Sequence, residues 1–105
     1  MDEFLSERED GLSEIQKWIE DRMPEIVKDL TRICRIRSVA ETEAVPYPPY
    51  GKGCLEVLEE MLHMGEENGF STRNYDNYVG KISYDTSEQK ESIGIWAHLD
   101  VVDEG

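Results

Sequence analysis

The chain has 105 residues, enough for one domain or for a piece of a larger one. Its 24 acidic residues against 11 basic ones give a formal net charge of -13. This charge excludes nucleic acid and anionic membrane surfaces as partners, because binding to either needs Lys and Arg. We interpret the acidity as a source of solubility rather than as attraction for a cationic substrate.

The sequence has the features of a cytoplasmic protein. Residues 1–10 are acidic and polar, the reverse of a signal peptide, and no apolar run approaches the length that spans a bilayer. Thiols stay reduced in the cytoplasm. We therefore expect the only two cysteines, Cys34 and Cys54, to be small core residues and not a disulfide.

The first periodic segment, residues 13–36, is predicted to be helical. Ser13 and Gln16 have the spacing of a capping box at its start. Pro24 lies inside the pattern and lacks the amide for a helical hydrogen bond, so it should either kink this helix or begin a second one. Apolar residues recur at intervals of three and four and form one stripe: Ile15, Trp18, Ile19, Met23, Ile26, Val27, Leu30, Ile33 and Cys34.

A loop and a second helix follow. Three prolines in residues 38–52 forbid helix there. Residues 53–68 are predicted to be a helix that ends at Asn68-Gly69, where glycine can adopt the left-handed conformation. Glutamates occupy its wet faces, and its buried stripe should consist of Leu55, Leu58, Met61 and Leu62.

The remaining sequence predicts strands at residues 70–75, 78–84 and 92–102, with a turn at Asp76-Asn77. Residues 92–102 (SIGIWAHLDVV) form the most apolar run and are predicted to be a buried strand. The fold class is therefore α/β: two helices followed by about three strands.

Two histidines are the candidates for chemistry, since there is no phosphate-binding glycine loop and no Ser or Cys paired with a His. His63 lies one helical turn from both Glu59 and Glu67. These three groups could bind a metal weakly, but a solvated His making ordinary one-turn contacts is the favoured interpretation.

His98 ends the apolar run, two residues before Asp100. Residues two apart share one face of a strand. The carboxylate can therefore accept the ring N–H of His98, fix its tautomer and leave the other nitrogen for a metal. From spacing alone, a structural His–Asp pair that holds a loop remains the alternative.

The residues around this pair add a resemblance. Residues 95–105 (IWAHLDVVDEG) resemble the first metal motif of the two-zinc exopeptidase and deacylase family: a hydrophobic strand, a small residue, His, any residue, Asp and two apolar residues. The segment Arg37-Ser38-Val39, the helix after the loop and Gly69-Phe70 are similar to the family's opening. The loop from Pro46 to Gly53 most resembles its bacterial dipeptidase branch.

The resemblance implies that residues 1–105 are the N-terminal piece of a zinc-peptidase catalytic domain. It makes His98 a zinc ligand and Asp100 the residue that orients it. The intact enzyme would use two zinc ions to hydrolyse the amide bond of dipeptides or short peptides, and this piece alone would be inactive. Asp103 stands where the family usually has Pro, which adds a charge near the site.

Two other functions remain open at this stage. One is an N-acyl amino acid deacylase of the same family, because substrate-reading residues lie elsewhere in it. The other, of a different class, is a free-standing acidic α/β interaction module with a structural His98–Asp100 pair. The sequence gives no indication of oligomeric state.

Overall fold

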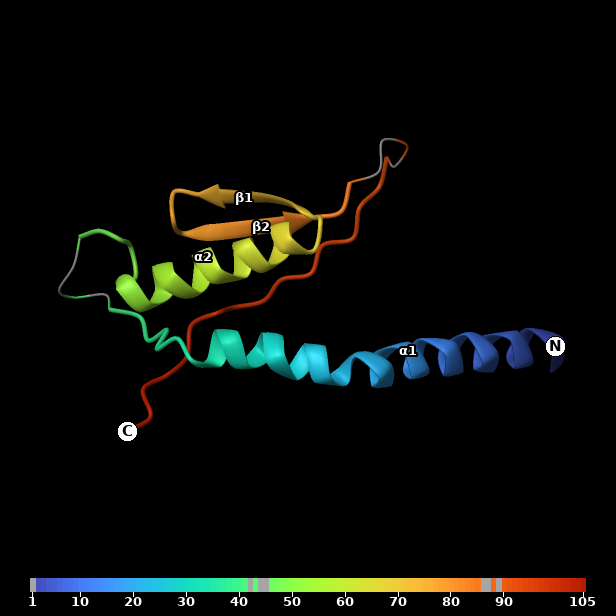
Figure 1. Ribbon diagram of the computed structural model, residues 1–105. Coiled ribbons are helices and arrows are strands. Elements are labelled where there is room, and N and C mark those ends of the chain that lie inside the picture. Colours follow the sequence, from blue (N-terminus) through green and yellow to red (C-terminus); the bar gives the residue numbers. More distant parts are fainter. Residues whose placement is uncertain (1, 42, 44–45, 86–87, 89) are drawn as a thin grey trace. The chain divides into compact units, whose positions relative to one another are not determined.

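The computed structural model describes residues 2–41, 43, 46–85, 88 and 90–105, and for residues 2–7 the backbone alone (Figure 1). The chain divides into two compact units, Met1–Arg32 and Ile33–Gly105. Its elements are α1 (Asp2–Cys34), α2 (Lys52–Glu67), β1 (Ser71–Tyr75) and β2 (Val79–Ser83). Helices followed by strands confirm the predicted α/β class. Within the described residues, no helix is both long and apolar enough to cross a membrane.

Helix α1 begins about eleven residues earlier than predicted, at Asp2. The capping box was wrong, because Ser13 and Gln16 lie inside the helix, where Gln16 Nε2 donates to Glu20 Oε1 at 2.9 Å. The preceding sequence contains mostly Glu, Leu, Arg and other residues that tolerate helix, so the helix extends through it. Pro24 lies within this one helix and begins no second one.

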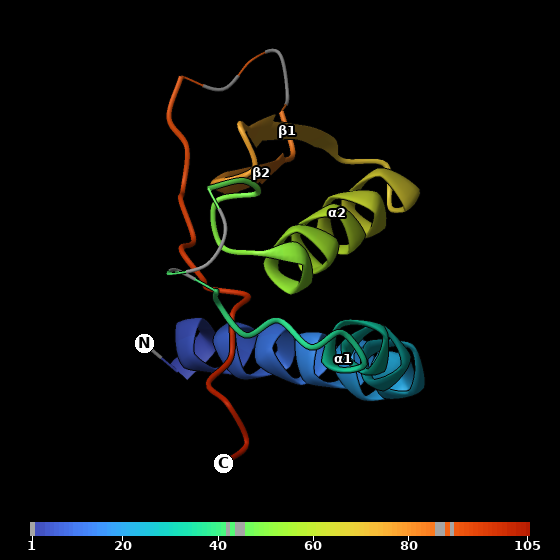
Figure 2. The same cartoon turned by 90° about the vertical axis from the view of Figure 1, so that its left-hand side faces the viewer.

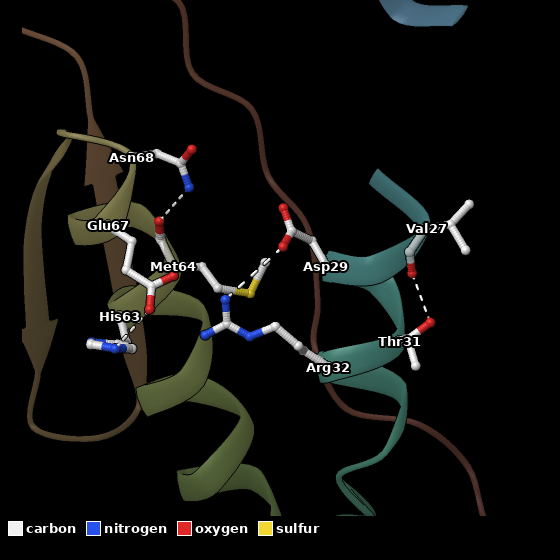
Figure 3. A network of polar contacts seen from close by, with 8 residues as sticks. All are labelled: Val27, Asp29, Thr31, Arg32, His63, Met64, Glu67 and Asn68. Carbon is white, nitrogen blue, oxygen red and sulfur yellow. Dashed lines mark hydrogen bonds and ion pairs between the residues drawn. The ribbon is translucent and has the colours of Figure 1, made fainter. Parts of the chain in front are cut away.

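The C-terminal turns of α1 satisfy polar groups locally. The Thr31 hydroxyl donates to the Val27 carbonyl at 2.7 Å, and Arg32 Nη1 lies 4.0 Å from Asp29 Oδ1 (Figure 3). Arg22 stacks over the Trp18 ring at 4.0 Å from its centroid. All of these contacts join residues three or four apart, as a helical surface requires.

Helix α2 matches its predicted bounds to within one residue and supplies the core of the second unit. Leu58 and Leu62 are buried as predicted, whereas Leu55 and Met61 are only half-buried. Val57 and Met64, outside the predicted stripe, are buried as well. The buried face is therefore centred closer to Val57 than the sequence pattern indicated.

The predicted stop of α2 is confirmed. Gly69 has a φ of 83°. Its N–H donates to the Glu66 carbonyl at 3.0 Å, and the Phe70 N–H donates to the Gly65 carbonyl at 3.0 Å. These two bonds form a Schellman motif, which satisfies carbonyls of the last turn and turns the chain into β1.

Strands β1 and β2 form the predicted hairpin. They are antiparallel, with Ser71 opposite Ser83 and Tyr75 opposite Val79. The turn residues Asp76 and Asn77 have φ values of 54° and 65°, as a type I′ hairpin turn requires. The Asn77 N–H donates to the Asn74 side-chain oxygen at 2.8 Å, which closes the turn.

Glycines let the hairpin approach α2 closely, and Figure 2 shows the two lying together. A Cβ added at Gly80 would stand 2.8 Å from a Leu58 methyl group and 2.9 Å from one of Leu62. A Cβ at Gly65 would meet the Ile82 side chain at 3.1 Å. Each element thus contributes one glycine and a bulky partner to the contact, which brings leucine side chains against the β2 backbone.

The predicted strand at residues 92–102 was wrong. This segment forms no strand, and the side chains of Ile93, Ile95 and Trp96 are 94%, 92% and 91% exposed. It contributes one isolated parallel bridge, Val101 with Val39. A buried parallel strand needs a ladder of hydrogen bonds with neighbouring strands. In the described part of the chain, residues 92–102 pair with Val39 alone. The described residues thus contain two strands rather than about three.

Candidate functional site

The functional site predicted at His98 and Asp100 is held to the rest of its unit by Ser38. Ser38 is 2% exposed. Its hydroxyl donates to the Leu99 carbonyl at 3.0 Å, and its own carbonyl accepts the Val101 N–H at 3.0 Å. The two residues that flank Asp100 are therefore both bonded to one buried serine. In the sequence, Ser38 stands out only as part of Arg37-Ser38-Val39, the segment that is similar to the opening of the exopeptidase and deacylase family.

Ser38 is in turn packed against the start of α2. A Cβ added at Gly53 would stand 1.9 Å from the Arg37 carbonyl oxygen, so only glycine permits this approach. The Cys54 thiol donates to the Ser38 carbonyl at 3.6 Å. Since a carbonyl has two lone pairs, it can accept from both Val101 and Cys54. The segment with His98 is thus linked through Ser38 to a helix terminus.

His98 and Asp100 are in contact, but the hydrogen-bond partner of the ring is the Asp100 backbone carbonyl rather than the carboxylate expected from the sequence. His98 Nδ1 lies 3.0 Å from the Asp100 carbonyl oxygen and 3.4 Å from its carboxylate Oδ1. Because a carbonyl oxygen only accepts, the shorter contact is a hydrogen bond when Nδ1 carries the proton. The His98 side chain is 86% exposed. Its Nε2 is therefore the nitrogen left for an external ligand.

A cavity of about 430 Å³ adjoins this pair. Its walls come from α2, the hairpin, the loop before α2 and the segment that carries His98. Most of the lining is apolar or aromatic, and the polar groups are few, as in small-molecule sites. The lining residues are Ala40, Tyr50, Cys54, Val57, Leu58, Met61, Leu62, Asn77, Tyr78, Gly80, Ile82, Ala97, His98, Leu99 and Asp100.

One wall of the cavity belongs to the loop of residues 38–52, which is rich in Pro and Tyr and was predicted from the sequence to be non-helical. The Asn77 side-chain amide donates to the Tyr47 hydroxyl, and the rings of Tyr50 and Tyr78 meet edge to face with centroids 5.8 Å apart. The Glu41 N–H donates to the Tyr50 carbonyl at 2.8 Å and closes the base of the loop. The tyrosines thus fix the loop to the hairpin turn.

Both cysteines are free thiols, as predicted, but Cys34 is exposed and Cys54 only half-buried, so the prediction that both are core residues was wrong. Burial raises the pKa of the Cys54 thiol, and the negative charges of Asp100 and Glu41 raise it further. A raised pKa keeps this thiol neutral, which makes it a weak nucleophile and a weak metal ligand. Cys54 therefore contributes a hydrogen bond rather than reactivity.

His63 is a surface residue of α2. Its Nε2 lies 2.9 Å from Glu67 Oε1, one helical turn away, and the His63 side chain is 60% exposed (Figure 3). The interpretation of His63 as a solvated helix residue in an ordinary one-turn contact is confirmed.

The donor set around His98 is small. Among the side chains described, those of residues 8–41, 43, 46–85, 88 and 90–105, no three from His, Cys, Asp or Glu converge as metal ligands. A catalytic zinc ion takes about three protein ligands. The described residues thus offer one imidazole and its orienting carboxylate, and they do not by themselves make a zinc site.

Asp103, which occupies a position where the resembled motif usually has Pro, pairs with Arg37. Arg37 Nη2 lies 3.2 Å from Asp103 Oδ1, and Nε lies 3.6 Å from Glu104 Oε1. Both ends of these ion pairs are well exposed, so each contributes little to stability. The negative charge that Asp103 adds is therefore paired with the Arg37 guanidinium. Sequence analysis missed this contact, since the residues are 66 positions apart.

Comparison with known proteins shows similarity to dipeptidases. No family model matches the chain. It is 38% identical over 82 residues to a Bacillus subtilis protein named "Putative dipeptidase YtjP", covering 77% of this chain and 17% of that protein. It is 33% identical over 81 residues to the Beta-Ala-Xaa dipeptidase of Lactobacillus delbrueckii subsp. lactis, covering 76% and 17%. The chain thus resembles dipeptidases over most of its own length and spans about a sixth of theirs.

Proposed function

We propose that the intact protein is a cytoplasmic zinc-dependent peptidase that hydrolyses the amide bond of dipeptides or short peptides. The observation that carries this proposal is the similarity to two proteins named as dipeptidases, over about three quarters of the chain. The contact between His98 and Asp100 supports it, because an imidazole oriented by a carboxylate is a common arrangement among zinc ligands.

Within this proposal, His98 and Asp100 have separate roles. Asp100 accepts a hydrogen bond from His98 Nδ1–H through its backbone carbonyl, and its carboxylate lies 3.4 Å from the same nitrogen; together they fix the ring and its tautomer. His98 then presents the Nε2 lone pair as a zinc ligand. The other ligands and the general base belong to parts of the intact protein beyond these residues.

The residues described here, taken alone, are expected to bind zinc weakly and to hydrolyse no peptide, because one imidazole falls short of about three ligands. Calorimetry on residues 1–105 checks this. A submicromolar affinity that disappears in His98→Ala would contradict it and would indicate a site shared between chains.

The function is tested by three variants of the intact protein. His98→Ala should remove one zinc ion per protein and abolish dipeptide hydrolysis. Asp100→Ala keeps the ligand and the backbone carbonyl that Nδ1 bonds, but it removes the carboxylate 3.4 Å from that nitrogen, and it should lower zinc affinity or turnover by about 10–100-fold. His63→Ala, on the solvated face of α2, is the matched control and should leave turnover unchanged.

The assays measure zinc content by atomic emission and the hydrolysis of dipeptides beside N-acyl amino acids. Faster turnover of N-acyl amino acids would favour the deacylase alternative. If His98→Ala keeps its full zinc content and wild-type turnover, the peptidase proposal is wrong and the His98–Asp100 pair is structural.

A further inference from the structure

Ser38 is buried, and both its hydroxyl and its carbonyl bond the segment that carries the candidate site. Its hydroxyl and carbonyl bond Leu99 and Val101, on either side of Asp100, at 3.0 Å each. A single residue with 2% exposure thus sets the position of a segment that is otherwise extended and largely exposed. Ser38 is separated from Asp100 by more than sixty residues of sequence.

Ser38 is held in place by the first turn of α2. Gly53 brings the helix start against the Arg37 carbonyl, and the Cys54 thiol bonds the Ser38 carbonyl from the same side. Ser38 therefore cannot shift without disturbing the first turn of α2. By contrast, the apolar side chains of residues 93–96 contribute little to holding the segment, because they are almost fully exposed.

We propose that Ser38 is a positioning residue for His98 and Asp100: its hydroxyl and carbonyl fix the backbone on which Asp100 holds the His98 ring. This inference rests on the proposed peptidase function. Ser38 contacts neither the ring nor a ligand. It acts through Leu99 and Val101, which determine where the Asp100 carbonyl and carboxylate lie.

Removing the hydroxyl has a definite local consequence. In Ser38→Ala the Leu99 carbonyl loses its donor, while the Val101 N–H still donates to the carbonyl of residue 38. The peptide between Leu99 and Asp100 thus loses the bond that restrains it. With one of the two bonds to residue 38 lost, the Asp100 oxygens would be held less firmly beside His98 Nδ1, and the ring less firmly with its proton on that nitrogen. A ligand whose tautomer is no longer fixed binds metal less tightly.

Enzyme kinetics of the intact protein give the first measurement. Ser38→Ala should lower kcat for dipeptide hydrolysis by about tenfold or more, with KM nearly unchanged, and lower zinc affinity in the same proportion. Ser38→Thr keeps the hydroxyl and should restore most of the lost kcat. Ser83→Ala is the matched control, because it removes a serine hydroxyl bonded to Asp85 on the hairpin surface, and it should retain wild-type kcat.

A second measurement separates positioning from a general loss of stability. Nitrogen-15 NMR of the metal-free protein, at a pH where the ring is neutral, reports which nitrogen of His98 carries the proton. The wild type should show the proton on Nδ1, and Ser38→Ala a mixture with Nε2. A merely structural serine would lower the melting temperature without changing this ratio in the folded protein.

Val101→Pro provides a variant that leaves Ser38 in place. It removes the N–H that the Ser38 carbonyl accepts, and the proline ring carbon that replaces this hydrogen would stand against that carbonyl and displace the segment. It should change the His98 tautomer ratio in the same direction as Ser38→Ala. This variant decides the matter if Ser38→Ala does not fold.

The outcomes distinguish this inference from the proposed function. If His98→Ala abolishes turnover while Ser38→Ala keeps wild-type kcat, or loses kcat with an unchanged tautomer ratio, the positioning role is wrong and the peptidase proposal stands. If His98→Ala itself keeps wild-type turnover, the proposed function has failed. Loss of kcat together with a changed ratio supports the inference.

Discussion

The α2–hairpin region and the segment of residues 92–105 are both rich in apolar residues, yet only the first packs. In the first, Val57, Leu58 and Leu62 are buried and the strands form a regular ladder. In the second, Ile95 and Trp96 are more than nine-tenths exposed. An apolar sequence therefore does not by itself form regular structure, because its side chains need a surface to pack against.

The difference lies in how far each region must reach for its partners. The Schellman motif at Gly69 and the I′ turn at Asp76-Asn77 bring α2, β1 and β2 together within 32 residues of sequence. Residues 92–105 depend on Ser38 and Val39, about sixty residues earlier. Local contacts fold one region, and a few distant hydrogen bonds position the other.

Removing one apolar side chain from each region, buried in the first and exposed in the second, gives the largest expected difference. Leu62→Ala should lower the free energy of unfolding by about 2–5 kcal/mol, because it leaves a cavity between α2 and Gly80. Ile95→Ala removes a side chain that is 92% exposed and should change it by less than about 0.5 kcal/mol. Urea denaturation followed by circular dichroism measures both. Equal losses would mean that residues 92–105 pack as tightly as α2.

The close approach that supports Ser38 can be tested at Gly53. Gly53→Ala should destabilise the chain by about 1–3 kcal/mol, because the new Cβ would stand 1.9 Å from the Arg37 carbonyl and backbone cannot rotate away. Gly11→Ala in α1 is the control. No atom lies within 4 Å of its added Cβ, and alanine favours helix by about 1 kcal/mol. Similar stabilisation at both positions would show that α2 does not press on residue 37.

The same contrast explains which sequence-based predictions succeeded. The bounds of α2, its stop at Gly69 and the hairpin turn were predicted correctly, because each depends on residues within a few positions. The capping box at Ser13 failed because the pattern it rests on also occurs inside helices. The strand at residues 92–102 failed because strand formation depends on neighbours that no local pattern specifies.

At the candidate site, the sequence indicated the pair but not its support. The spacing of His98 and Asp100 predicted that they meet, and the ring lies 3.4 Å from the carboxylate, but its hydrogen bond goes to the Asp100 carbonyl, which the pattern did not indicate. The metal role of His98 stays a prediction. Ser38 and the Arg37–Asp103 ion pair could not be found from a single sequence, because contacts more than sixty positions apart leave no local periodicity.

The position of Cys54 between the two regions predicts its reactivity. Burial and the charges of Asp100 and Glu41 raise its pKa, so the thiolate forms only at higher pH than in the unfolded chain. In a Cys34→Ser background, alkylation of Cys54 by iodoacetamide should be slower in the folded chain than in urea at every pH below the raised pKa. Ser38→Ala should reduce the difference between the alkylation rates in the folded chain and in urea, if the segment that carries Asp100 moves away from Cys54 in this variant. Equal rates in the folded and unfolded chain would contradict the buried position of the thiol.

The smallest expected effect concerns the exposed ion pair that joins residues 92–105 to Arg37, next to Ser38. Arg37 and Asp103 side chains are 60% and 65% exposed, so water and salt screen their attraction. A double-mutant cycle with Arg37→Gln and Asp103→Asn should give a coupling free energy of about 0.2–1 kcal/mol. This coupling should vanish at high salt, because screening acts on exposed charges, whereas the effect of Ser38→Ala should persist. A salt-insensitive coupling above about 2 kcal/mol would mean that the Arg37 pair, rather than buried Ser38, holds the segment with His98.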